Sequence, residues 1–561
     1  MPPILPPCIM SASMGLQAVP FRDIPHTTDL FTAYLDEFSR VARFYSHIPD
    51  ASGIDASARE VRLDAQTRRA VVGVLHEQNR SFAPASTIDP AVSKNLDRLA
   101  AGAVTIVTGQ QAGLFSGPAF SFYKALSAIR CAEETTRRGI DAVPVFWIAT
   151  EDHDVAEVNH SFWNTRHGLA RHDLPVRDEF AGRRVGEVPL GDAVQSLAVD
   201  ATSALDGVCV DAVSSALRES YSPGETYGSA FAKLMSRFLA GRGIILLDPL
   251  DARFHRLAAP IFARAFAESD ALREALLARS KDLESNGFHA QVKVTQESTL
   301  LFFNANGRRE PVRMRNGSFF AGDTEFSSSQ LARAIEKSPE AVSPNALLRP
   351  VVQDALLPTA AYIGGPAEIA YLAQSQVIYQ RLLGRMPAIL PRASFTFVEP
   401  PIARFLSLYD LGFKDILAGP QHVRAVMEQK SLPGGLSSRF DRAEQTMRNL
   451  LDEFKVPLEN LDATLVGALQ STQEKMLHQF NQLRGKVGRA ENFRTGVLDR
   501  HQQILFDALY PEGGLQERSL CFLPLLATYG PGILDKVLQL SFLGSAAAAE
   551  SKSHEHQIIF L

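Results

Sequence analysis

Residues 104–160 read VTIVTGQQAGLFSGPAFSFYKALSAIRCAEETTRRGIDAVPVFWIATEDHDVAEVNH, and this stretch decides the fold. Val104–Val107 is a short β-branched run, which predicts a strand. Thr108–Gly113 interrupts it with two glycines, and Pro118 then predicts a helix start, where its missing N–H is not needed. The apolar run Ala142–Ala149 predicts a second strand that is covered by helices on both faces. This order is typical of a parallel α/β sheet with its ligand site at the carboxyl ends of the strands.

The glycine loop after the first strand is a candidate anion site. Glycine lets the backbone approach a ligand closely, the first amides of a helix point outward, and Lys124 adds a positive charge within two turns. The spacing matches neither a Walker A loop nor GxGxxG, so a plain turn between strand and helix is the structural alternative. The candidate cofactor-binding residues are Thr108, Gly109, Gln110, Gln111, Gly113, Gly117 and Lys124.

Acids and histidines gather directly after the second strand. Carboxylates at this place could hold an amine or act as a base, and a neutral histidine could relay protons. Asp152, Asp154 and His160 could instead bind a divalent metal, although the spacing fixes no ligand count or geometry, and the cluster could equally be a solvated acidic turn. We assign no metal. The catalytic candidates are Glu151, Asp152, His153 and Asp154, and the substrate-binding candidates are Asn159 and His160.

A second unit of strand, glycine turn and helix is predicted near residue 360. The run Leu356–Ile363 is followed by a Gly-Gly-Pro turn and an alanine-rich helix. Two such units facing each other predict a cleft at the strand ends of an open α/β sheet. An arginine there could bind a phosphate or carboxylate, although Arg349 and Asp354 could equally form a structural ion pair. The predicted substrate-binding residues here are Arg349, Gln353, Asp354, Gly364, Gly365, Glu368 and Arg392.

Apolar and small residues recur at heptad-like spacing towards the C-terminal end. Steps of three and four residues, with one extra residue near Met476, predict a coiled-coil helix that begins after Pro457. This seam could pair with a second copy of the chain or with the preceding helix Arg439–Phe454 as an intramolecular hairpin, and both could hold. The seam consists of Leu458, Leu461, Leu465, Ala468, Thr472, Met476, Phe480, Leu483, Val487 and Ala490.

Composition favours a large enzyme that acts on small molecules. The 561 residues exceed a single hydrophobic core, and a net charge of −5 argues against nonspecific nucleic-acid binding. The four cysteines lack CxxC spacing, so neither a disulfide framework nor a zinc ribbon is indicated, and a reducing cytoplasm is the default. No apolar window has the length of a membrane span, and MPPILPPCIM lacks the basic flank of a signal peptide. We expect a cytoplasmic protein without membrane or nucleic-acid partners.

Several motifs together resemble the cysteine-adding enzymes of bacillithiol biosynthesis, the BshC family. The resemblance runs in family order from Phe21 to Leu561. Ser116 departs from it, because the family usually has a second glycine before the proline, and Cys521 replaces a more usual polar residue. The motifs are TGQQAGLFSGP with the following FYK, PVFWIATEDHDVAEVNH, SPNALLRPVVQDALLPTAAYIGGPAEIAYLAQ from Ser343, PRASFTFVEP from Pro391, PEGGLQERSL from Pro511 and the terminal HQIIFL.

The resemblance implies a Rossmann-like core similar to class I aminoacyl-tRNA synthetases and nucleotidyltransferases, with inserted connecting domains and a C-terminal coiled coil that forms a homodimer. It implies no defined catalytic triad. Residues before Phe21 are expected to form a disordered tail, unless translation starts at Met10 or Met14. The expected domains are the tail, 1–20; the core, 21–160, 241–290 and 343–430; connecting insertions, 161–240 and 291–342; the helical coiled coil, 431–510; and a segment that returns to the core, 511–561.

The activity implied by the resemblance is the last step of bacillithiol biosynthesis, in which L-cysteine is joined through its carboxyl group to the amine of glucosaminyl malate. Amide formation from a free acid is uphill in water, so we expect ATP with Mg²⁺ at the glycine loop to activate the carboxylate as an adenylate or acyl phosphate. Two alternatives share such a core. One is another nucleotide-dependent enzyme that transfers aminoacyl or nucleotidyl groups, and the other is a non-catalytic nucleotide-binding dimer, which would not need the acids and histidines.

Overall fold

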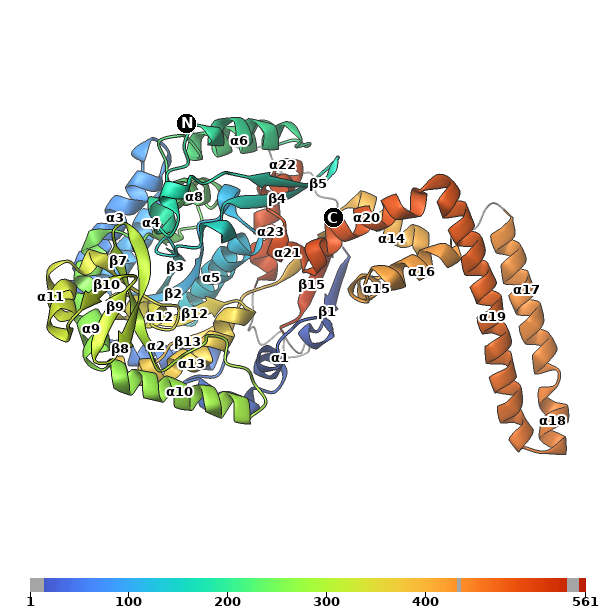
Figure 1. Cartoon of the computed structure of the whole chain (residues 1–561). Helices are drawn as coiled ribbons and strands as arrows, with labels where there is room; N and C mark the ends of the chain where they lie inside the picture. Colours follow the sequence, from blue (N-terminus) through green and yellow to red (C-terminus); the bar gives the residue numbers. More distant parts are fainter. Residues whose placement is uncertain (1–14, 431–434, 542–553) are drawn as a thin grey trace. The chain divides into compact units, whose positions relative to one another are not determined.

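The computed structural model describes residues 15–430, 435–541 and 554–561. The chain divides into two units, and Figure 1 colours them along the sequence. Within the described part, the first unit holds residues 20–395 and 517–557, and the second holds 15–19, 396–516 and 558–561. Because Leu16–Val19 forms strand β1, the disordered tail predicted over residues 1–20 is wrong at its end. Residues 1–14, with the two alternative starts, lie outside the described residues.

A five-stranded parallel sheet forms the centre of the first unit. Its order is β13 (Ala388–Pro391), β12 (Thr359–Gly364), β2 (Val104–Gln110), β3 (Ala142–Ile148) and β6 (Ile245–Leu247). From β2 the chain first winds through β3 to β6, and it later returns to add β12 and β13 on the other side of β2. The direction of winding therefore switches between β2 and β12, which is where open α/β sheets bind ligands.

Apolar helices cover this sheet and explain why its strands are apolar nearly throughout. Helix α5 (Phe120–Arg137) connects β2 to β3 and packs on both, and α13 (Pro366–Leu382) connects β12 to β13. The core between the sheet and α5 includes Ile106, Ala128 and Ile363. Helix α5 begins two residues after the predicted start at Pro118, whose carbonyl accepts a turn hydrogen bond from the Ser121 N–H.

The other elements of the first unit surround this core (Figure 1). The N-terminal helices are α1 (Asp29–Asp36), α2 (Ala51–Glu60), α3 (Ala65–Phe82) and α4 (Pro90–Ala101). Between β3 and β6 lie β4 (His160–Thr165), β5 (Gly168–Asp173), α6 (Ala193–Ser203), α7 (Val210–Ser220) and α8 (Tyr227–Phe238). The later helices are α9 (Ala252–Ala267), α10 (Ser269–Ser285), α12 (Arg349–Leu356), α21 (Gln516–Ser519), α22 (Leu523–Tyr529) and α23 (Gly532–Leu540).

An antiparallel sheet is inserted between α10 and α12. Its order is β10 (Thr324–Phe326), β9 (Ser318–Ala321), β8 (Arg308–Arg315), β7 (Ser298–Ala305) and β11 (Val342–Pro344), and α11 (Ser328–Lys337) connects β10 to β11. Turns with positive φ at Asn306 and Gly307 and at Asn316 and Gly317 join its strands, as expected for tight hairpins. This sheet supplies one wall of the site described below.

The second unit is mostly helical. It contains α14 (Pro400–Tyr409), α15 (Phe413–Leu417), α16 (Pro420–Lys430), α17 (Leu436–Asp452), α18 (Lys455–Leu461), α19 (Thr464–Thr495) and α20 (Val497–Leu509). Strands β14 (Phe395–Val398) and β15 (His556–Phe560) join β1 in a small sheet. The prediction that the core extends to residue 430 is wrong, because α14 and α16 pack on α19 and α20.

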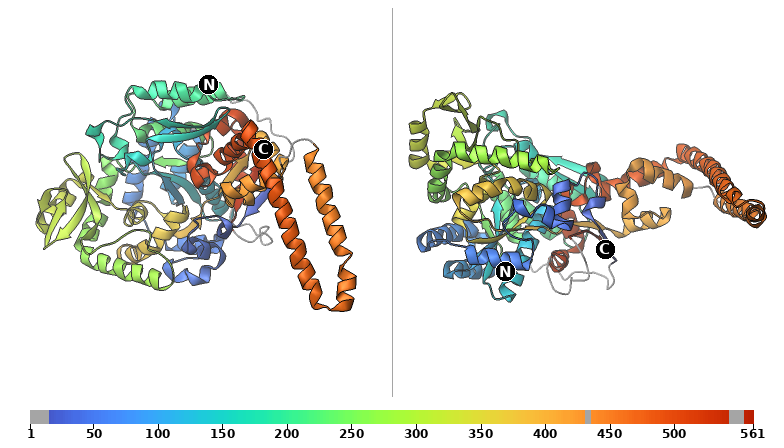
Figure 2. Two further views of the ribbon diagram at one scale, coloured as in Figure 1. Left: turned by 45° about the vertical axis from the view of Figure 1, so that its right-hand side comes forward. Right: turned by 90° about the horizontal axis from the view of Figure 1, so that it is seen from below.

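Helices α17 and α19 form an intramolecular hairpin, which Figure 1 and the left view of Figure 2 show as two adjacent rods. The Phe440 and Phe480 rings lie 5.1 Å apart inside it. The predicted helix end near Phe454 is close to the observed one, because α17 ends at Asp452. The long helix does not begin directly after Pro457, however: Pro457 lies in the first turn of the short α18, where no N–H is needed, and α19 begins after a second break at Asp462, whose carboxylate caps the Thr464 N–H. Although α19 is 32 residues long, neither it nor any other described helix is apolar enough to cross a membrane.

Candidate active site at the switch point of the parallel sheet

A cavity of about 1000 Å³ lies at the carboxyl ends of the central strands. Its walls come from the ends of β2 and β3, the N-terminus of α13, and strands β7 and β8 of the inserted sheet. Its charges have both signs, with an excess of cations in a chain that is acidic overall. The charged lining residues are the cations Lys124, Lys293, Arg309, Arg313, Arg349, Arg392 and Arg518 and the carboxylates Glu151, Asp152, Glu157 and Glu368.

Lys124 and Glu368 form a buried ion pair between α5 and α13. Lys124 Nζ lies 2.5 Å from Glu368 Oε2 and donates to the Gly109 carbonyl at 2.7 Å and to Gln110 Oε1 at 2.9 Å. Burial lowers the pKa of Lys124, and the charge of Glu368 opposes this effect. Lys124 therefore braces the end of β2 from within the protein, and its predicted phosphate contact would compete with these three bonds.

Other protein atoms, rather than a ligand, fill the space beside the two loop glycines Gly109 and Gly113. A Cβ on Gly113 would lie 2.7 Å from Gly117 Cα, and one on Gly109 would lie 2.8 Å from the Trp147 carbonyl. Thr108 is fully buried and donates to the Ile363 carbonyl at 2.8 Å. Of the seven predicted loop residues, the cavity is lined by Gly109, Gln110, Gln111 and Lys124, whereas Thr108, Gly113 and Gly117 lie outside its described lining.

The two departures from the family pattern contact each other beside this loop. Ser116 Oγ lies 3.8 Å from Cys521 Sγ, and the Cys521 thiol also donates to the Phe115 carbonyl. Both side chains are buried, and burial raises the pKa of Cys521 to about 11. The two side chains therefore form a buried packing contact with each other.

Glu368 caps the helix that carries it. Its Oε2 accepts from the Gly365 N–H at 2.7 Å and its Oε1 from the Tyr362 hydroxyl at 2.6 Å. Burial raises the pKa of Glu368, but Lys124 and the Gly365 N–H outweigh this effect and hold it below its ordinary value. The carboxylate therefore stays ionised and keeps the N-terminus of α13 fixed at the cavity, where Gly365, Pro366 and Ala367 line it.

The ion pair considered between Arg349 and Asp354 does not form. Arg349 donates to Gln353 Oε1 at 3.0 Å and to the Tyr371 hydroxyl at 2.9 Å, and it faces the cavity. Asp354 instead accepts from Gln353 Nε2 and from the Tyr379 hydroxyl. Gln353 and Asp354 are buried and lie outside the described cavity lining, so the prediction that they bind substrate directly is wrong.

Asp152 and His153 face the cavity from the turn after β3. Gln111 Nε2 donates to both Asp152 Oδ2 and Glu157 Oε2, each at 2.6 Å, and so joins the two loops. His153 Nδ1 lies 3.1 Å from an Arg309 guanidinium nitrogen. Because arginine can only donate, Nδ1 is the acceptor and the ring proton of neutral His153 resides on Nε2. Arg309 is itself fixed by Ser343 and by stacking on Phe302.

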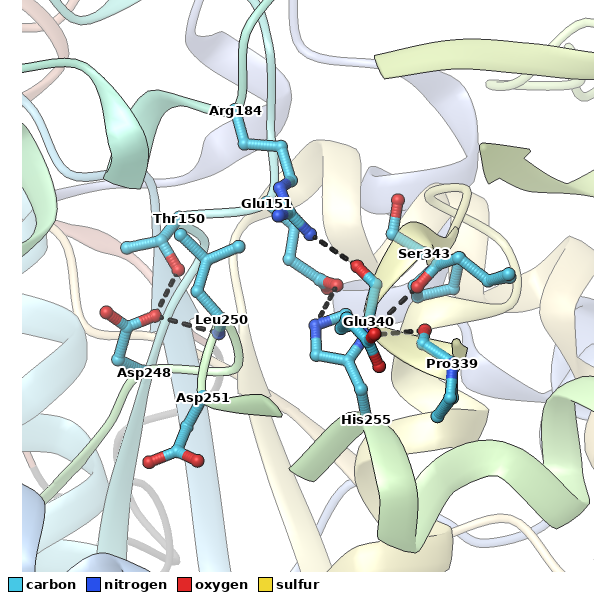
Figure 3. A network of polar contacts seen from close by, with 12 residues as sticks. Thr150, Glu151, Arg184, Asp248, Leu250, Asp251, His255, Pro339, Glu340 and Ser343 are labelled. Carbon is cyan, nitrogen blue, oxygen red and sulfur yellow. Dashed lines mark hydrogen bonds and ion pairs between the residues drawn. The ribbon is translucent and has the colours of Figure 1, made fainter. Parts of the chain in front are cut away.

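Glu151 points into the protein. Figure 3 shows its carboxylate facing His255, with 3.4 Å between Oε1 and Nε2, while His255 Nδ1 faces the Pro339 and Val342 carbonyls. Glu151 touches the cavity but is 7% exposed, which suits it to hold the turn after β3. The same view shows Asp248 at the end of β6, bonded by Thr150 and the Leu250 N–H, and burial raises its pKa to about 6.

Four further candidates lie outside the described cavity lining, and one of them is Gly364 at the end of β12. Asp154 is exposed, Asn159 donates to the Leu174 carbonyl at 3.4 Å, and His160 Nδ1 lies 3.2 Å from the Ala156 carbonyl. Within the described residues, no three His, Cys, Asp or Glu side chains are grouped to hold a metal ion, so the metal alternative for Asp152, Asp154 and His160 finds no geometric support.

Several lining residues carry no local sequence signal. Arg309, Arg313 and Lys293 come from the inserted sheet and the segment before it, and Arg518 comes from α21 near the C-terminal end. Only the tertiary fold brings them to the end of the parallel sheet. The one available signal for Arg518 was its place inside the PEGGLQERSL motif.

Comparison with known proteins covers both units. Residues 14–393 match "Bacillithiol biosynthesis BshC, N-terminal Rossmann-like domain", and residues 395–561 match "Bacillithiol biosynthesis BshC, C-terminal coiled-coil domain". A protein of Koribacter versatilis named "Putative cysteine ligase BshC" is 40% identical over 93% of this chain and 96% of its own length. Proteins of the same name from Solibacter usitatus and Salinibacter ruber are 35% and 31% identical, over 91% and 90% of this chain and 94% and 93% of their own lengths.

Proposed function

Since the chain belongs to the bacillithiol biosynthesis BshC family, we propose that it is a cytoplasmic ligase that joins L-cysteine, through its carboxyl group, to the amine of glucosaminyl malate. This reaction would be the last step of bacillithiol synthesis. The mixed charge of the cavity carries the proposal. Both substrates have carboxylates that suit its cations, and the acceptor amine suits the acids after β3. A site for anions alone would not need those acids.

Asp152 is the group best placed to receive a proton from the acceptor amine. Its carboxylate lines the cavity and is held by Gln111 Nε2 and by the His153 N–H at 2.7 Å. As the amine nitrogen bonds to the activated cysteine carboxyl carbon, the bond from that carbon to the AMP or phosphate leaving group would break, and the nitrogen must lose a proton that a carboxylate within reach can take. His153 presents a donor at Nε2, which suits it to bond a carboxyl oxygen rather than to act as the base.

ATP with Mg²⁺ would supply the free energy that amide formation from a free acid requires. The residues fit a polyphosphate, because the N-terminus of α13 and the guanidinium groups of Arg392 and Arg518 line the same cavity. Gly109 and Gln110, which accept hydrogen bonds from Lys124, line the same cavity and would border the bound nucleotide. Mg²⁺ usually reaches such sites with the nucleotide and its waters, without a dedicated protein cage.

Purified protein with cysteine, glucosaminyl malate and MgATP should yield the amide, detected by mass spectrometry. Asp152→Asn should lower its rate on the order of a hundredfold without unfolding the protein. Asp154→Asn is the matched control, because Asp154 is two residues away and exposed outside the cavity lining. Absence of the amide with native protein would overturn the substrate assignment, and a full rate for Asp152→Asn would overturn the role of Asp152.

We also propose that the hairpin of the second unit forms a homodimer. The hairpin buries Phe440 and Leu477 but leaves Met476 and Leu483 42% and 51% exposed. These two line an apolar groove together with Phe480 and the stem of Lys475. Part of the predicted seam therefore serves the intramolecular hairpin, and another part remains for a second copy of the chain.

Light scattering tests this dimer. Met476→Glu with Leu483→Glu should give monomers that keep their helix content, because both side chains are exposed in the single chain. Gln482→Glu is the matched control, since it adds one charge to the same helix outside the described groove. Dimers that persist in the double variant would exclude this interface.

A further inference from the structure

Three motifs that are far apart in the sequence meet in one buried polar cluster beside the cavity. Ser394 follows β13, Glu517 lies on α21 and His556 begins β15. Their exposed fractions are 3%, 1% and 0%, so no substrate can reach the serine or the histidine directly. The cluster, which we call the Glu517 cluster and which also includes Arg392, can act on a ligand only through a residue that reaches the cavity.

Glu517 is the centre of this cluster. Its Oε1 accepts from an Arg392 guanidinium nitrogen at 2.6 Å and from Ser394 Oγ at 2.7 Å, and its Oε2 accepts from the Phe395 N–H at 2.9 Å. Burial raises the pKa of Glu517, but the charge of Arg392 and the hydrogen bonds from Arg392 and Ser394 outweigh this and hold it below its ordinary value. The carboxylate is therefore ionised and fully bonded.

His556 closes the cluster from the other side. Its Nδ1 lies 2.7 Å from Ser394 Oγ. Burial lowers the pKa of His556 to about 4, so the ring is neutral, and because the Ser394 hydroxyl donates to Glu517, Nδ1 carries the ring proton and donates to Ser394 Oγ. The Gln557 N–H also donates to the Ser394 carbonyl at 3.0 Å and fixes the register. A continuous chain of bonds runs from His556 through Ser394 and Glu517 to Arg392.

Arg392 carries this chain to the cavity. Its guanidinium lines the cavity and stacks on the Phe120 ring at 5.1 Å, and it also donates to the Ala393 carbonyl. Arg518, the residue after Glu517, lines the cavity too. Burial and the nearby charge of Arg392 lower the pKa of Arg518. Two cations beside one buried carboxylate leave net positive charge directed at the cavity, which suits an anionic ligand group.

We propose that Glu517, Ser394 and His556 are positioning residues that hold Arg392 ready for a phosphate or carboxylate of a ligand, so that the strand at the C-terminal end completes the anion site. The inference rests on the proposed function only for the identity of that ligand. The shared chemistry is a planar or tetrahedral oxyanion, which a guanidinium group binds with strong, directional hydrogen bonds. Fixing the fork before binding avoids the cost of ordering it during binding.

The test measures binding of three probes by calorimetry: tripolyphosphate as a generic anion, MgATP and glucosaminyl malate. His556→Ala should lower the affinity for tripolyphosphate about tenfold, since it removes one buried hydrogen bond from the series that ends at Arg392. His556→Asn should restore most of the affinity, because the asparagine Nδ2 can replace Nδ1 as the donor. Gln557→Ala is the matched control on the next residue, whose side chain points to the opposite face of the strand. Ser394→Ala repeats the test where His556→Ala is poorly folded.

A double-mutant cycle separates positioning from general stability. If His556 acts through Arg392, His556→Ala should cause no further loss in an Arg392→Ala background. Additive losses, unchanged affinity in His556→Ala and Ser394→Ala, or no anion binding by the native protein would each overturn the inference. MgATP and glucosaminyl malate are then compared with tripolyphosphate across the same variants. The one whose affinity changes in the same way as that of tripolyphosphate carries the phosphate or carboxylate that Arg392 binds. Tripolyphosphate binding without binding of either substrate would refute the proposed reaction and leave the positioning role intact.

Discussion

Lys124→Met should destabilise the first unit by about 3 kcal/mol, because it leaves one half of a buried ion pair. The side chains of Lys124 and Glu368 are 3% and 17% exposed, so the orphaned carboxylate gains little from water. Loss of one partner of such a pair costs about 3–5 kcal/mol. We expect the lower end of that range because Glu368 keeps its bonds from the Gly365 N–H and the Tyr362 hydroxyl. Methionine preserves most of the apolar volume of the lysine stem.

Glu368→Gln separates the charge from the packing. Glutamine can keep its oxygen on the Gly365 N–H and turn its NH2 group towards the Tyr362 hydroxyl as a donor, so adding it to Lys124→Met should recover at least about 1 kcal/mol. Urea unfolding followed by tryptophan fluorescence is the assay, since the two tryptophans, Trp147 and Trp163, are both buried in the first unit. A Lys124→Met protein within about 0.5 kcal/mol of the native value, which is the range of exposed substitutions, would refute the reasoning.

Three further changes test other parts of the structure. Because burial raises the pKa of Asp248 to about 6 from its ordinary 3.8, the native state binds a proton that the unfolded state releases, and stability falls as pH rises through this window. Through this group, the free energy of unfolding of the native protein should fall by about 1.4 kcal/mol between pH 5 and pH 7.5. For Asp248→Asn the fall should be smaller by about this amount. Equal falls for the two proteins in urea titrations would contradict the assignment. Gly113→Ala should lower the free energy of unfolding by about 1–3 kcal/mol, because the new Cβ would lie 2.7 Å from Gly117 Cα. Gly73→Ala is the control, since a Cβ at Gly73 in α3 meets open space and should not destabilise the protein. An unchanged urea midpoint for Gly113→Ala would contradict the packing role and favour a role of this glycine in the close approach of a ligand. Phe440→Ala should cost about 3–5 kcal/mol and abolish slow hydrogen exchange in α17 and α19, and retained protection would show that the hairpin does not depend on this ring.

The parts of the fold that sequence could predict are those with local causes. The β-branched run at Val104, the apolar run at Ala142 and the glycine turns specify strands and turns without reference to distant residues, and both strands form as expected. The cluster of acids after β3 could be found from the sequence for the same reason. The direction of each side chain could not be predicted, because it depends on distant partners: Glu151 turns towards His255 and Asp152 towards Gln111.

The failures have long-range or geometric causes. Residues five apart on a helix do not face each other, so Arg349 and Asp354 could not pair once α12 formed. The loop glycines signalled a close approach correctly, but not that the approaching partner was the chain itself. Arg309 reaches the cavity only because the inserted sheet lies against the end of β3, and no pattern within β8 encodes that contact.

The cluster around Glu517 also sets the order in which the protein can mature during synthesis. Ser394 and His556 are separated by 162 residues, which a ribosome adds in roughly ten to thirty seconds. For most of that interval Arg392 and Ser394 would lack Glu517, and for all of it Ser394 would lack His556. The emerging polypeptide therefore has an incomplete polar cluster at its ligand site until residue 556 has been synthesised. A chain that stopped short of His556 would keep most of its apolar core yet carry this defect beside its ligand site.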